Sequence, residues 1–123
     1  KKNKNETNVI CAKNVLDYND LLKSCDIGLS TVTIKKKIIP ENFFPTLKTK
    51  EDYVAWLKLT KMNNKAHKLN EILVIWNKTK NSLSSDIFQK IKDGYKVYRL
   101  YEKFNILISI FCLIRLSLNS FKK

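Results

Sequence analysis

Residues 49–62 read TKEDYVAWLKLTKM, and this stretch decides the fold of the chain. Its large side chains recur at i, i+3, i+4 and i+7, the spacing of one helical face: Tyr53, Trp56, Leu57 and Thr60. Thr49 and Asp52 form a Thr-x-x-Asp pattern, which predicts a capping box at the start of a helix. We therefore expect a helix over residues 49–62 that packs one face into the core.

Before this helix, the sequence predicts a short helix and a strand. Residues 17–23 form the expected helix, capped by Asp17. Residues 29–36 alternate between polar and apolar side chains, which predicts a strand with Val32 and Ile34 toward the core.

After the central helix, a second strand and two helices are expected. The apolar residues 71–76 predict a buried strand. Ser85 or Asp86 then begins a long helix that ends near Lys103, with Phe88, Ile91, Tyr95 and Tyr98 on successive turns. Gly94 costs this helix about 1 kcal/mol relative to Ala, and a close packing contact would explain it. Because two strands make no independent sheet, we expect both to pair with strands outside this chain.

The charge and the cysteines limit the classes of function. The 123 residues carry a net charge of +13. Almost all of the positive charge is lysine, whereas nucleic-acid readers favour the bidentate guanidinium of arginine. Nucleic-acid binding is therefore not favoured, and an anionic membrane surface explains the charge equally well. The three cysteines have no C-x-x-C spacing, which argues against a zinc site and favours a reducing cytosol.

The order of short motifs around the central helix resembles that of bacterial family 2 glycosyltransferases, which build capsular and other surface polysaccharides. The central match is EDYxxWL at 51–57. The segments SCDIGLSTV (24–32) and FPxL (44–47) precede it, and LNExL (69–73), KNSLSS (80–85) and YKVY (95–98) follow it. The resemblance covers roughly residues 15–120.

This resemblance implies an α/β fold. The chain would be the C-terminal, acceptor-side part of a GT-A fold, the Rossmann-like fold of nucleotide-diphospho-sugar transferases. It would be mainly helical, with a few strands of an incomplete mixed sheet. The family's D-x-D motif, which holds a divalent metal (Mg or Mn) beside the nucleotide sugar, is absent from this sequence. We therefore expect the donor and the metal to bind a separate N-terminal half, and this fragment alone to bind no cofactor and to be inactive.

The resemblance also implies the residues that act on the acceptor. By position, Asp52 is the general base that deprotonates the acceptor hydroxyl in an inverting transfer, and Glu51 supports it. Trp56, Trp76 and Ser82 are the expected acceptor contacts. Two alternatives stay open: Asp52 as a helix cap, and Trp56 as a core residue. Where the family commonly has Arg, this sequence has Asn77 after Trp76.

Other polar residues receive no catalytic role from the pattern. His67, the only histidine, has no local partners for metal binding and suits a surface or strand edge. The serines of residues 82–85 suit turns and caps better than nucleophilic catalysis.

The C-terminal residues form a second predicted unit. Residues 1–103 would belong to the transferase domain, and residues 104–123 would form an apolar and basic helix. Its apolar run is too short to span a bilayer, so we expect it to rest on the inner face of the cell membrane. That makes the protein cytoplasmic and peripheral. Packing on the absent half or in a homodimer is the alternative.

The expected function is therefore transfer of a sugar from a nucleotide sugar to a saccharide or lipid-linked saccharide in surface polysaccharide synthesis. The alternative is a non-catalytic basic helical module that binds a membrane surface or a protein partner.

Overall fold

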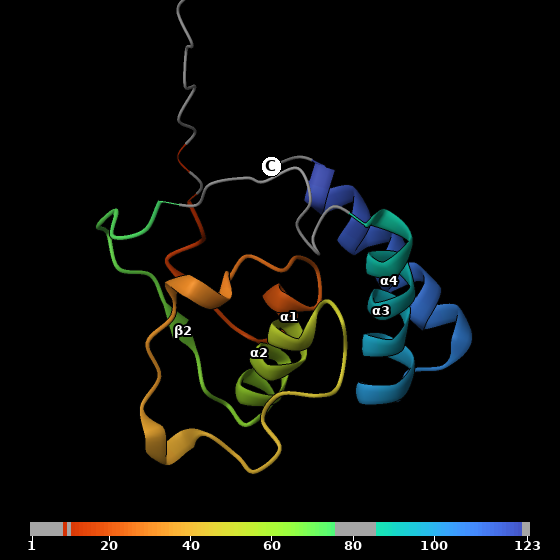
Figure 1. Cartoon of the computed structure of the whole chain (residues 1–123), viewed down its shortest axis with the longest axis horizontal. Helices are drawn as coiled ribbons and strands as arrows, with labels where there is room; N and C mark the ends of the chain where they lie inside the picture. Colours follow the sequence, from red (N-terminus) through yellow and green to blue (C-terminus); the bar gives the residue numbers. More distant parts are fainter. Residues whose placement is uncertain (1–8, 10, 76–85, 122–123) are drawn as a thin grey trace, which may run out of the picture.

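Helices form most of the regular structure of the computed structural model, which describes residues 9, 11–75 and 86–121 (Figure 1). In chain order the elements are β1 (Val15–Leu16), α1 (Tyr18–Leu21), η1 (Leu29–Thr31), η2 (Lys36–Ile38), α2 (Glu51–Lys61), β2 (Ala66–His67), α3 (Ile87–Lys96), η4 (Val97–Tyr101) and α4 (Ile106–Phe121). The helix α1 packs on α2, and α3 lies beside α4 (Figure 1).

The predicted central helix is confirmed as α2, but it is buried on more than one face. Its buried residues are Tyr53, Val54, Ala55, Trp56, Leu57, Leu59 and Thr60. They form the largest part of the core cluster, which Leu16, Leu21, Val97 and Leu116 join from other elements. The i, i+3, i+4 spacing therefore identified the helix and part of its buried surface.

The predicted capping box of α2 is wrong. Lys50 is the N-cap residue, in a left-handed conformation with φ of 67°, and its side chain makes no capping hydrogen bond. Thr49 instead donates to Asp93, through its backbone nitrogen and its hydroxyl, both at 3.0 Å. Asp52 accepts from the backbone nitrogen of Tyr53 at 2.7 Å. Thr49 therefore bonds to Asp93, 44 residues away in the sequence, and not to Asp52 in its own turn.

Neither predicted strand forms in the described residues. Residues 29–31 make the 3-10 turn η1, in which the hydroxyl of Thr31 donates to the Gly28 carbonyl at 2.8 Å. Val32 and Ile34 are half-buried against the core, so the alternation predicted their burial correctly. Residues 71–75 are exposed and carry no strand, with Ile75 78% exposed. Among the described residues, no strand pairs with either segment, so α2 does not pack on a sheet built from them.

The sheet that does form was not predicted. β1 and β2 are antiparallel, with Val15 opposite His67 and Leu16 opposite Ala66. Leu16 is buried in the core, and Ala66 is half-buried against it. Two residues a strand give too little periodicity to be recognised in a sequence. The pair ties the segment before α1 to the segment after α2.

The long helix predicted to begin at Ser85 or Asp86 and to end near Lys103 is confirmed in part. Asp86 caps α3 by accepting from the backbone nitrogen of Gln89 at 3.0 Å. The helix then continues into the π-helical turn η4. The predicted apolar face is wrong at its start, because Phe88 is 87% exposed. Tyr98 of the predicted face is buried, and the other buried residues are Asp93, Gly94 and Val97.

Gly94 permits the close approach of α3 and α4. A Cβ atom at this position would lie 2.9 Å from Cδ1 of Leu113. The packing contact expected for this glycine is thus confirmed.

The last helix, α4, is apolar on two sides. Ser109 and Leu116 are buried against the rest of the molecule, and Cys112 and Leu113 are half-buried. Five apolar side chains project from the other side, and we call them the outer face of α4: Leu107, Ile110, Phe111, Ile114 and Leu118. Among the described residues, no helix has both the length and the hydropathy needed to cross a membrane.

Candidate functional site

The acidic pair of the EDYxxWL motif lies in the first turn of α2. Glu51 and Asp52 are both half-buried, whereas the two residues that follow, Tyr53 and Val54, are fully within the core. A carboxylate in this position is favoured by the positive end of the helix dipole. The burial of the helix behind the pair fixes the backbone that carries both acids.

Burial raises the pKa of the Asp52 carboxyl above its ordinary value. The negative charge of Glu51 acts in the same direction, while the hydrogen bond from the Tyr53 backbone nitrogen and the charge of Lys50 oppose it. A carboxylate with a raised pKa is a better proton acceptor than a fully solvated one. General-base chemistry at Asp52 would make use of this raised pKa, and that role stays a prediction.

Tyr53, the third residue of the motif, is a structural anchor. Its hydroxyl donates to the Leu21 carbonyl at 2.7 Å and lies 2.9 Å from the hydroxyl of Tyr98. The Tyr98 hydroxyl also lies within bonding distance, 3.2 Å, of the Leu22 carbonyl. Burial raises the pKa of both phenols, so both stay protonated and available as donors. These bonds join α1, α2 and η4 directly behind the acidic pair.

A second polar cluster joins the opposite end of α2 to η4. Glu102 is 8% exposed and accepts a hydrogen bond from the hydroxyl of Tyr18. The same oxygen accepts from the ammonium of Lys61 at 2.9 Å. Burial and the hydrogen bond to Glu102 raise the pKa of the Tyr18 phenol. The two ends of α2 are thus each fixed by a buried carboxylate, Glu102 at one end and Asp93 at the other.

Asp93 is a buried polar residue that the sequence did not single out. Its side chain is 1% exposed. One carboxylate oxygen accepts from Thr49 and from the side-chain amide of Gln89, at 2.8 Å. The local pattern around it, a charged residue in a helix, is typical of a solvated face. Only the distant partner Thr49 distinguishes it, and no sequence pattern shows that contact.

Of the three expected acceptor contacts, the structure describes only Trp56. Trp56 is 3% exposed and lies edge-on to Phe43, with ring centroids 6.0 Å apart. This burial favours the core role of Trp56 over stacking on an acceptor. Its indole nitrogen is buried without a hydrogen-bond partner in the described residues. Trp76 and Ser82 lie outside the described residues.

No metal site is found in the described ranges. Within residues 9, 11–75 and 86–121, no three His, Cys, Asp or Glu side chains group closely enough to hold an ion. His67 is exposed in β2, which agrees with the expected strand-edge position. Cys11, Cys25 and Cys112 form no disulfide within the described part of the chain.

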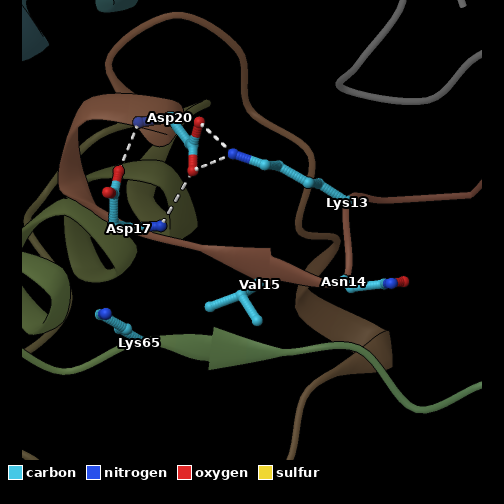
Figure 2. A pocket seen from close by; sticks show the side chains of 6 residues that line it. All are labelled: Lys13, Asn14, Val15, Asp17, Asp20 and Lys65. Atoms are coloured by element: carbon cyan, nitrogen blue, oxygen red, sulfur yellow. Dashed lines mark hydrogen bonds and ion pairs between the residues drawn. The ribbon is translucent and has the colours of Figure 1, made fainter.

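A small pocket lies apart from the acidic pair, beside β1 and α1 (Figure 2). It is lined by Lys13, Asn14, Val15, Asp17, Asp20 and Lys65. Its acids already have structural roles, since Asp17 caps α1 and Asp20 pairs with Lys13 at 3.0 Å. Neither Glu51 nor Asp52 lines this pocket.

Comparison with known proteins gives two similar bacterial glycosyltransferases. The chain is 32% identical to TuaG of Bacillus subtilis (strain 168), named as a teichuronic acid biosynthesis glycosyltransferase. That match covers 93% of this chain and 45% of TuaG. The chain is 35% identical to WfgD of Escherichia coli, a UDP-Glc:alpha-D-GlcNAc-diphosphoundecaprenol beta-1,3-glucosyltransferase, over 67% of this chain and 32% of WfgD.

Both relatives are longer than this chain. It spans less than half the length of either relative. No family model matches the chain, and no solved structure matches it. Both relatives are glycosyltransferases, and the similarity to them supports a glycosyltransferase role for this chain.

Proposed function

We propose that this chain is the acceptor-side part of an inverting family 2 glycosyltransferase, with the GT-A fold completed by a donor-binding half. The observation that carries the proposal is the Asp52 carboxylate, half-buried, with a raised pKa, at the start of a helix whose next residues lie in the core. Similarity to two glycosyltransferases over most of the chain supports it.

In the proposed reaction, Asp52 acts on the acceptor hydroxyl. Its carboxylate accepts the hydroxyl proton as the hydroxyl oxygen forms a bond to the anomeric carbon of the donor sugar. The bond from that carbon to the nucleoside diphosphate breaks on the opposite face, and the diphosphate takes the electron pair. Attack from the opposite face inverts the configuration of the anomeric carbon. Glu51 raises the proton affinity of its neighbour and orients the acceptor.

The described residues do not fit a divalent metal. They include no group of carboxylates, thiols or imidazoles that would hold one. Any Mg or Mn that balances the charge of the departing diphosphate belongs to the donor-binding half, and Asp52 needs no metal for its step.

The proposed acceptor is a saccharide carried on a lipid diphosphate. The name of WfgD specifies such an acceptor, GlcNAc linked through a diphosphate to undecaprenol. A lipid-linked saccharide lies at the membrane surface, so the enzyme would act there. The outer face of α4 supports this location, since Leu107 is 80% exposed and Phe111 64% exposed. Arg115 and the net charge of +13 would attract anionic lipid. We therefore propose a cytoplasmic, peripheral position on the inner face of the membrane.

A titration of the 123-residue chain tests the acceptor role. The probes are a water-soluble, short-chain analogue of GlcNAc-diphospholipid and, separately, UDP-glucose with Mg²⁺. We expect the analogue to shift the carboxyl NMR resonances of Glu51 and Asp52, and UDP-glucose to leave them unchanged. Tight, metal-dependent binding of UDP-glucose, or shifts by the analogue confined to residues far from α2, would contradict the proposal. A non-catalytic module would give no shift at Asp52 with either probe.

A further inference from the structure

We propose that Asp93 is a positioning residue for the acidic pair and acts on it through Thr49 and the left-handed turn at Lys50. This inference rests on the proposed function, in which Asp52 is the general base. Asp93 does not approach the acceptor itself in this scheme. Its effect is to hold the first turn of α2, and with it the two carboxylates, in one geometry.

One carboxylate oxygen of Asp93 accepts three hydrogen bonds, two from Thr49 and one from Gln89, and we call this contact the Asp93–Thr49 clasp. That oxygen of Asp93 accepts from the backbone nitrogen of Thr49 at 3.0 Å, from its hydroxyl at 3.0 Å, and from the amide of Gln89 at 2.8 Å. The other oxygen lies 3.6 Å from the ammonium of Lys96. Hydrogen bonds to a charged acceptor are stronger than neutral ones. The Asp93–Thr49 clasp therefore fixes both the backbone and the side chain of Thr49.

Thr49 lies directly before the strained residue of this segment. Lys50 has a φ of 67°, a left-handed conformation that disfavours residues with a side chain. Its carbonyl nevertheless accepts the first helical bond of α2, from the backbone nitrogen of Val54 at 3.2 Å. The Lys50 side chain makes no capping hydrogen bond, and its ammonium lies over the Tyr53 ring, 5.8 Å from the ring centroid. Contacts of the neighbouring residues therefore help to hold the turn. The clasp supplies one of these contacts on the N-terminal side, at Thr49, two residues before Glu51.

The charge state of Asp93 suits this role at neutral pH. Burial alone would raise the pKa of its carboxyl, but hydrogen bonds from Gln89 and Thr49 and the charge of Lys96 outweigh burial and lower the pKa. Since the pKa is lowered on folding, the clasp is complete above the ordinary Asp pKa and is lost as pH falls through the lowered value.

The structure offers a matched control for a merely stabilising role. Glu102 is also a buried carboxylate with two strong donors, but it contacts Lys61 at the C-terminal end of α2. Removal of either acid should destabilise the fold. Only loss of the clasp should change the environment of Asp52.

The test measures the Asp52 carboxyl pKa by carbon-detected NMR in the full chain. The first variant is Thr49→Val, which removes one donor to Asp93, keeps the side-chain shape and leaves every charge unchanged. We expect the Asp52 pKa to fall toward the ordinary value of about 3.9, because a loosened first turn admits water. Thr49→Ser keeps the hydroxyl and should restore the raised pKa. Glu102→Gln should lower the melting temperature and leave the Asp52 pKa as it is.

A kinetic test separates this inference from the proposed function. It uses a TuaG graft, in which this chain replaces the matching segment of TuaG. There, Thr49→Val should lower kcat by up to about 10²-fold, the effect of a misplaced catalytic group, with KM for the donor unchanged. An unchanged Asp52 pKa in Thr49→Val, or an equal change in Glu102→Gln, overturns the positioning role. If Asp52→Asn leaves transfer intact, the proposed function fails, and the NMR result still decides whether Asp93 controls Asp52.

Discussion

Removal of the Tyr53 hydroxyl should cost this fold a measurable share of its stability. Tyr53→Phe deletes a buried oxygen that lies 2.7 Å from the Leu21 carbonyl and 2.9 Å from the Tyr98 hydroxyl. Tyr98 keeps an alternative acceptor, the Leu22 carbonyl at 3.2 Å. The Leu21 carbonyl loses this donor altogether. Loss of one net hydrogen bond, together with a buried carbonyl left without its donor, should lower the free energy of unfolding by about 2 to 3 kcal/mol.

The expected loss is large enough to be measured by urea unfolding and by thermal melting. For a chain of this length, about 2 to 3 kcal/mol lowers Tm by about 8 to 12 °C. Tyr95→Phe is the matched control, because Tyr95 is half-buried and its hydroxyl makes no hydrogen bond to another described residue. It should change stability by less than about 0.5 kcal/mol.

A double-mutant cycle completes the test. Because the Tyr53 and Tyr98 hydroxyls contact each other, the loss in the double Phe variant should be smaller than the sum of the two single losses. If Tyr53→Phe costs no more than Tyr95→Phe, the hydroxyl pair does not anchor α2. The motif tyrosine would then need another explanation.

Three further predictions concern the acidic pair, the contact of α3 with α4, and the outer face of α4. In the TuaG graft, Asp52→Asn should lower the transfer rate by about 10²–10⁴-fold and leave donor binding unchanged. If the variant keeps more than about a tenth of the transfer rate of the unsubstituted graft, Asp52 has only a structural role. Gly94→Val should destabilise the chain by at least about 1 kcal/mol, measured by urea unfolding, because a Cβ at this position already lies 2.9 Å from Leu113. Leu113→Ala should relieve part of that cost, whereas strictly additive effects of the two substitutions would refute the contact. Leu107→Ser with Phe111→Ser should abolish sedimentation of the chain with anionic liposomes, whereas unchanged sedimentation would exclude the outer face as the membrane contact.

The sequence predicted the helices of this fold far better than its extended segments. The spacing of Tyr53, Trp56 and Leu57 identified α2, and Asp17 and Asp86 were correctly placed as caps, since a cap bonds within its own turn. A strand needs hydrogen bonds from a neighbouring strand, and its own residues do not specify that neighbour. Residues 29–36 alternate as a strand would, yet with no partner they form turns and extended backbone.

The candidate site shows the same division between local and distant contacts. The motif singled out Asp52, and the structure places its carboxyl half-buried in the first turn of α2, where burial raises its pKa. The capping role given to Thr49 was wrong, because its true partner, Asp93, is 44 residues away. That contact depends on how α3 packs against the core, and no period or local motif encodes it. The role assigned to Asp52 stays a prediction until it is tested in an active enzyme.

The span of the polar contacts has a consequence for synthesis of the chain on the ribosome. The amide of Asn119 donates to the Lys23 carbonyl at 2.8 Å, across 96 residues, and the Tyr18–Glu102 bond crosses 84. Most residues of α2 are buried, and part of their packing partners lie in η4 and α4. The helix α2 therefore cannot complete its packing until η4 and α4 have left the ribosome. Contacts of such separation slow folding and leave apolar segments exposed to aggregation meanwhile. A nascent chain stalled before residue 102 should therefore bind chaperones and be cleaved readily by protease, whereas one stalled with residues 1–123 outside the tunnel should resist both.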